Sequence, residues 1–165
     1  MNGNTHEEFW MNTLLTRHGA ADPLVPDEPP RILVADDEDA LRLVLTRELR
    51  RRGFDVLSTS SGAEAVEVYI RSTLRIDLVL LDVAMPGMSG PDALDALREA
   101  DPLVRCCFMT ADLRPDRHSA LLARGVLAVY GKPFDSLAEL CLELRRVVED
   151  GRRRADREGV PTWTS

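Results

Sequence analysis

The chain is short of several things that would point to particular functions. Lys132 is the only lysine among 21 Lys and Arg residues, and aromatic residues make up 5% of the chain. The three cysteines show no Cys-x-x-Cys or Cys/His spacing, and no apolar run is long enough to span a bilayer. These absences argue against a zinc site, a disulfide framework and a membrane partner.

The charge balance narrows the class of protein further. The formal net charge of −7 argues against nucleic-acid binding, which favours a basic surface. The basic run Arg152–Arg154 lies among acidic residues, and we interpret it as part of a solvated tail. No signal-peptide pattern opens the chain, and the cysteines fit small core residues in a reducing compartment. We therefore expect a cytoplasmic protein, of undetermined oligomeric state.

The pattern of apolar residues divides the 165 residues into three parts. Residues 1–30 read as an N-terminal extension with a proline-rich linker, residues 31–150 as one domain and residues 151–165 as a tail. Within the domain, apolar runs predict strands at 32–35, 54–57, 78–81, 104–109 and 126–130. Helical patterns follow them at 39–52, 62–72, 89–100, 115–124 and 135–150. This alternation predicts an α/β fold with an open five-stranded parallel sheet covered by helices on both faces.

Polar residues follow four of these strands. Asp36 and Asp37 come after the first strand, Asp82 after the third, Thr110 after the fourth and Lys132 after the fifth. Parallel strands share one carboxyl edge, so these side chains should meet there. Three carboxylates in one place repel one another unless a cation joins them, and hard oxygen ligands suit Mg²⁺. We expect Mg²⁺ on Asp37 and Asp82, with Asp36 acting through water.

The chemistry that this arrangement permits is phosphoryl transfer to a carboxylate. Asp82 is the best nucleophile, because it stands alone after a buried strand and before a turn-forming loop. Lys132 would hold one phosphoryl oxygen and the Thr110 hydroxyl another. A compact ammonium suits a single oxygen better than the planar guanidinium that the chain uses everywhere else.

These residues lie in segments that resemble the receiver domain of bacterial two-component response regulators. The matching segments are Ile32–Glu38, Asp77–Gly90, Met109–Ala111 and Gly131–Phe134. The resemblance implies a flavodoxin-like (βα)5 receiver fold and phosphorylation of Asp82 by a histidine kinase or histidine phosphotransfer protein. It also implies Mg²⁺ held by Asp36, Asp37, Asp82 and the Ala84 carbonyl, with Thr110 as switch hydroxyl and Lys132 as phosphate-binding lysine.

The chain departs from the family pattern at one switch position and beyond the end of the domain. Val129 stands three residues before Lys132, where the family usually has an aromatic residue that moves with the threonine. Tyr130 is one step later, so its side chain should point to the opposite face of the sheet. We therefore expect the signal to leave through 111–115. No output domain comes after the last helix, which predicts a stand-alone receiver with an unknown downstream protein target.

The sequence thus favours a signalling receiver over an enzyme, its only reactions being phosphoryl transfer to itself and autodephosphorylation. The alternative is a receiver-like interaction module that works without phosphorylation, which would have no need of the complete acidic set. A hydrolase with an aspartyl-phosphate intermediate characteristically has a second Asp two residues after the nucleophile. Here that residue is Ala84.

Overall fold

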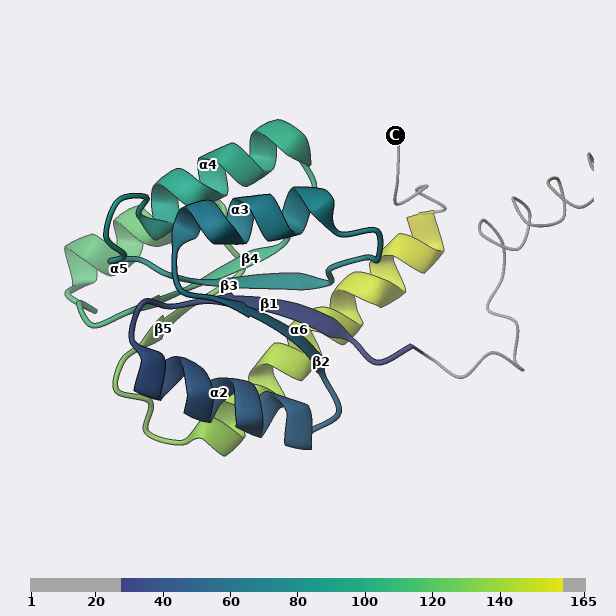
Figure 1. Cartoon of the computed structure of the whole chain (residues 1–165), viewed down its shortest axis with the longest axis horizontal. Helices are drawn as coiled ribbons and strands as arrows, with labels where there is room; N and C mark the ends of the chain where they lie inside the picture. Colours follow the sequence, from purple (N-terminus) through teal and green to yellow (C-terminus); the bar gives the residue numbers. More distant parts are fainter. Residues whose placement is uncertain (1–27, 159–165) are drawn as a thin grey trace, which may run out of the picture. The chain divides into compact units, whose positions relative to one another are not determined.

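The computed structural model describes residues 28–158, and residues 29–151 form one unit that contains every described strand. Five parallel strands form one sheet in the order β2-β1-β3-β4-β5 (Figure 1). The strands are β1 (Arg31–Ala35), β2 (Asp55–Thr59), β3 (Leu78–Asp82), β4 (Cys106–Thr110) and β5 (Val129–Gly131). The helices are α2 (Asp39–Arg51), α3 (Gly62–Arg71), α4 (Gly90–Ala100), α5 (Pro115–Leu122) and α6 (Leu137–Glu158).

The helices cover both faces of the sheet, as Figure 1 shows. One core cluster joins the sheet to α2 and α6, with Leu45 and Leu144 fully buried. The other joins it to α3, α4 and α5, with Leu97 fully buried. The central strand β3 is buried along its whole length, which explains its unbroken apolar composition. The predicted fold class is confirmed.

The register of the strands aligns their carboxyl ends. Ala35, the last residue of β1, lies beside Leu81 of β3, so Asp36 follows next to Asp82. Asp82 in turn lies beside Met109, and Thr110 beside Gly131. Because all pairings are parallel, the residues that come after these strands converge on one edge.

Several predicted boundaries were wrong. The fourth strand begins at Cys106 rather than 104, and the last is limited to Val129–Gly131. The last helix continues to Glu158 rather than ending at 150, so the basic run Arg152–Arg154 lies within a helix. The expectations for residues 1–27 and 159–165 lie outside the described residues.

Two expectations from composition can be compared with the described structure. The three cysteines are buried and free, as small core residues. Within residues 28–158, no helix combines the length and apolar character that a bilayer span requires.

Candidate functional site

Three carboxylates meet at the carboxyl edge of the sheet. Asp36 and Asp37 follow β1, and Asp82 ends β3; one oxygen from each lies within 4.8 Å of the others. Asp36 is fully buried and Asp82 nearly so, whereas Asp37 is exposed. The Asp36 Oδ1 accepts a hydrogen bond of 2.8 Å from the Glu38 backbone N–H. That bond orients the side chain at the start of α2, and leaves the other carboxylate oxygen facing the cluster.

The lone lysine lies among these carboxylates. Lys132 Nζ is 2.8 Å from Asp36 Oδ2 and 3.2 Å from Asp82 Oδ1. Only 13% of its side chain is exposed, so both ion pairs are largely shielded from water. One ammonium against three carboxylates leaves the cluster with two uncompensated negative charges. A divalent cation bound by oxygen ligands would balance them.

The charges of the site shift the pKa values of Asp82 and Lys132. Burial raises the pKa of Asp82, and the Asp36 and Asp37 charges raise it further, against the opposing effect of the Lys132 ammonium. Burial alone would lower the pKa of Lys132, but the hydrogen bond to Asp36 and the Asp82 charge together raise it. The ammonium is therefore held in its charged form, while an anionic Asp82 carries a desolvation cost.

Thr110 ends β4, next to the strand that leads to Lys132. Its carbonyl accepts a 2.7 Å hydrogen bond from the Lys132 backbone N–H, which ties the two segments together. Its hydroxyl accepts a 3.1 Å hydrogen bond from the Asp112 backbone N–H. The hydroxyl thus bonds to the following loop, which connects β4 to α5.

The loop after Asp82 is held close to the nucleophile candidate. A Cβ atom on Gly90 would lie 2.3 Å from the Asp82 carbonyl oxygen, so only glycine fits there. The Gly90 backbone N–H donates to the Val83 carbonyl at 3.1 Å, which closes the loop. Ala84 lies exposed within this loop. Its carbonyl as a metal ligand stays a prediction.

Sequence reasoning missed two residues that support the site. One is Gly90, whose close approach no local pattern announces. The other is Arg42, which donates from Nη1 to the Asp36 carbonyl at 2.6 Å and also pairs with Asp39. The spacing of Asp39 and Arg42 along α2 is that of a helical ion pair, and this was the available signal.

Val129 and Tyr130 point to opposite faces of the sheet. Tyr130 packs against the cluster under α2 and α6. Val129 packs against the cluster under α3, α4 and α5. The register argument for these two residues is confirmed, so Tyr130 does not occupy the place of the missing aromatic residue.

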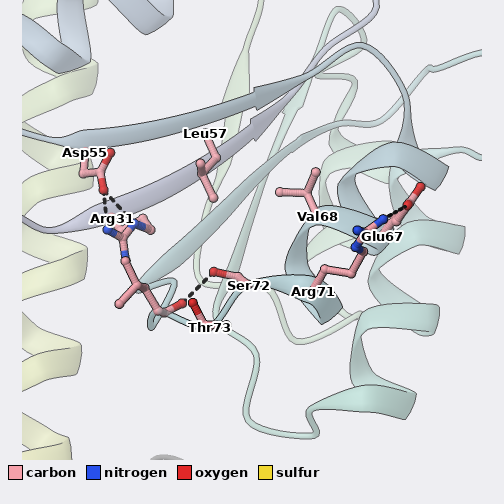
Figure 2. A pocket seen from close by; sticks show the side chains of 9 residues that line it. Arg31, Asp55, Leu57, Glu67, Val68, Arg71, Ser72 and Thr73 are labelled. Carbon is pink, nitrogen blue, oxygen red and sulfur yellow. Dashed lines mark hydrogen bonds and ion pairs between the residues drawn. The ribbon is translucent and has the colours of Figure 1, made fainter.

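A separate cleft of about 450 Å³ lies at the other end of the strands (Figure 2). Arg31 and Asp55, which begin β1 and β2, line it together with the last turn of α3. Figure 2 shows Arg31 paired with Asp55, and Arg71 with Glu67, on its walls. Because it lies at the amino ends of the strands, this cleft is not part of the acidic site.

Comparison with known proteins identifies the fold and the class. The family model of the response regulator receiver domain matches residues 32–145. The chain is 31% identical over 105 residues to sporulation initiation phosphotransferase F of Bacillus subtilis, covering 64% of this chain and 83% of that protein. It is 37% identical over 139 residues to the probable transcriptional regulatory protein TcrX of Mycobacterium tuberculosis, covering 84% of this chain and 55% of TcrX.

Other similar proteins differ in overall length. Sensor kinase CckA of Brucella abortus is 33% identical over 118 residues, which are 72% of this chain but 12% of that protein. The chain thus spans a small part of CckA and about half of TcrX. Among solved structures, response regulator TrrA of Thermotoga maritima in complex with Mg²⁺ and BeF has a TM-score of 0.62 at 29% identity, covering 72% of this chain and 98% of TrrA.

The chain therefore belongs to the response regulator receiver family, whose members are phosphorylatable receivers of two-component signalling systems. Receiver domains are signalling modules rather than classical enzymes. They bind Mg²⁺ at an acidic pocket and take their phosphoryl group from histidine kinases or phosphotransfer proteins. The cluster of Asp36, Asp37 and Asp82 fits such a pocket in its donor atoms and its charge.

The ion pairs of Lys132 should contribute measurably to the stability of the fold. In metal-free buffer, Lys132→Met should lower the free energy of unfolding by on the order of 3 kcal/mol, because it leaves buried carboxylates without their counter-charge. Arg124→Met is the matched control: its pair with Asp95 is at the surface, so about 0–1 kcal/mol should be lost. Urea denaturation measures both. Equal losses in the two variants would contradict the proposed importance of the buried ion pairs.

Proposed function

We propose that this receiver accepts a phosphoryl group on Asp82 from a histidine kinase or a histidine phosphotransfer protein. The observation that carries the proposal is that the chain's only lysine lies between Asp36 and Asp82. Asp82 stands at the end of a buried strand, with its loop closed by the tight packing of Gly90. Such a fixed carboxylate is already oriented for attack on a phosphodonor.

The transfer step exchanges one bond to phosphorus for another. A carboxylate oxygen of Asp82 attacks the phosphorus of a phosphohistidine, the P–N bond breaks, and the imidazole nitrogen keeps the electron pair. Lys132 Nζ, already 3.2 Å from Asp82, then holds an oxygen of the transferred group. The Thr110 hydroxyl, released from Asp112, donates to a second oxygen. Hydrolysis of the acyl phosphate by water returns Asp82 to its carboxylate form.

Asp36, Asp37 and Asp82, with the carbonyl of Ala84, would hold Mg²⁺ in this site. When bound, the ion would neutralise charge on the transferring group. The charge balance supports the need for a bound cation, because Lys132 compensates only one of three clustered carboxylates. Asp36, fully buried and oriented by the Glu38 N–H, is suited to hold the ion through water.

The phosphorylated state would be passed on by binding a downstream protein or by relaying the group. The phosphoryl group adds negative charge and acceptor oxygens, which would bind the Lys132 ammonium and the Thr110 hydroxyl. In the unphosphorylated structure these two groups bond to Asp36 and to Asp112. Their reorientation changes the loops that they hold, and with them the surface available to a partner.

Phosphorylation should depend on Asp82. With Mg²⁺ and acetyl phosphate, the parent should gain the mass of one phosphoryl group, and Asp82→Asn should gain none because an amide is not a nucleophile of this kind. Asp95→Asn, at an exposed carboxylate of α4, is the control and should label like the parent. Mass spectrometry of the intact protein measures this. Full labelling of Asp82→Asn would place the phosphorylation site elsewhere.

Mg²⁺ affinity should depend on Asp37. Calorimetry should show a loss of at least about tenfold for Asp37→Ala, since even indirect ligand partners contribute this much to metal affinity. Asp39→Ala removes an exposed carboxylate two residues further along, outside the cluster, and should bind Mg²⁺ nearly as well as the parent. If Asp37→Ala matched Asp39→Ala, the metal would have to bind at other ligands.

The response to a phosphoryl group should need lysine and not merely positive charge. Beryllofluoride, a phosphoryl mimic, should change the hydrogen-exchange protection of residues 110–118 in the parent. In Lys132→Arg a planar guanidinium replaces a point donor, so beryllofluoride should leave the protection of these residues unchanged. Arg124→Lys makes the reverse exchange at a surface ion pair and should respond like the parent. Hydrogen exchange measured by mass spectrometry compares them. A parent-like response of Lys132→Arg would show that any cation suffices.

A further inference from the structure

The loop between Thr110 and α5 folds back onto the last strand through one side chain. Leu113 lies against Gly131: a Cβ atom on that glycine would be 2.2 Å from Leu113 Cδ1 and 3.0 Å from Cγ. The leucine therefore occupies the space that any other residue at position 131 would fill. About half of Leu113 (48%) remains exposed, so Gly131 provides a seat for the side chain rather than a deep pocket.

This seat is directly connected to the site. Gly131 is the strand partner of Thr110 and precedes Lys132, whose backbone N–H donates to the Thr110 carbonyl. On the loop side, the Thr110 hydroxyl accepts the hydrogen bond from the Asp112 N–H, one residue before Leu113. The hydroxyl thus holds the loop in the position that puts Leu113 on Gly131.

Beyond this loop, α5 is the most weakly anchored helix on its face of the sheet. None of its residues is buried, whereas α4 buries Gly90, Ala93, Leu94 and Leu97. Few buried apolar contacts mean that α5 can shift at low cost. Val129, the neighbouring β5 side chain on this face, packs against the core cluster and is short and branched, so it has little freedom to transmit a movement.

We propose that Leu113, seated on Gly131, is the positioning residue that couples the Thr110 hydroxyl to α5. When Thr110 turns to a phosphoryl oxygen on Asp82, Asp112 loses its acceptor, the loop moves and Leu113 leaves Gly131. The start of α5 moves with it, because Arg114 and Pro115 follow immediately. This inference rests on the proposed function of Asp82, and adds to it the route by which the signal leaves the site.

Hydrogen exchange over residues 111–122 tests the coupling, with and without Mg²⁺ and beryllofluoride. In the parent, beryllofluoride should speed exchange in this segment. In Leu113→Ala, exchange should already be about fivefold faster without ligand, the effect of losing roughly 1 kcal/mol of local stability, and beryllofluoride should add less than twofold. Leu113→Met keeps an apolar side chain on the glycine and should behave like the parent.

A control and a second substitution make the test specific. Leu142→Ala removes a leucine of nearly equal exposure (49%) from α6 and should leave residues 111–122 unchanged. Gly131→Ala should displace Leu113 and raise exchange as Leu113→Ala does. The double variant Leu113→Ala/Gly131→Ala should exchange no faster than either single variant, because both remove the same contact.

The possible failures are distinguishable. If Leu113→Ala gains the phosphoryl mass but its loop exchanges and responds like that of Leu142→Ala, the coupling through Leu113 is wrong and the phosphorylation of Asp82 stands. Additive effects in the double variant would also overturn the coupling. If the parent itself gains no mass from acetyl phosphate and shows no response to beryllofluoride, the proposed function fails, and the inference fails with it.

Discussion

The structure depends on an incomplete balance of charge at the carboxyl edge of the sheet. Asp36 and Asp82 are almost completely removed from water, and Lys132 is the cation that makes their burial tolerable. A buried charge without a partner would cost several kcal/mol. Because a single ammonium serves more than one carboxylate, any new anion or cation in the site changes what Lys132 bonds to. The excess of negative charge therefore destabilises the resting state of the site and makes the site responsive to a bound ion or a phosphoryl group.

The two sides of the site are held with different firmness. On the β3 side, Gly90 packs directly on the Asp82 carbonyl, and α4 follows with a capping box between Ser89 and Asp92. On the β4 side, the loop after Thr110 is held by the hydroxyl bond to Asp112 and by one half-exposed leucine. A change in the site will act where the restoring forces are smallest. That asymmetry directs movement toward α5 and away from the nucleophile.

Most strands and helices of the fold can be predicted from the local sequence pattern, but the residues at which they begin and end cannot. The apolar runs predict all five strands because helices cover both faces of the sheet. The strand β5, however, is a half-buried edge strand with a partner on one side only, and hydrogen bonding sets its limits. The last helix passes Gly151, where a helix would often end. At this point Gly151 packs on the Arg105 guanidinium, which also donates to the Val147 carbonyl at 2.6 Å. Arg105 and α6 are far apart in the sequence, so no local pattern predicts this contact.

The sequence by itself determined which residues meet at the site. Parallel strands share a carboxyl edge, so Asp36, Asp82 and Lys132 had to converge, and strand alternation alone assigned Val129 and Tyr130 to opposite faces. The tertiary structure decided the contacts made by loops and long side chains, such as Arg42 on the Asp36 carbonyl and Leu113 on Gly131. These contacts have no period in the sequence, because the path of a loop and the reach of a side chain depend on the surfaces they find after the sheet and helices have packed.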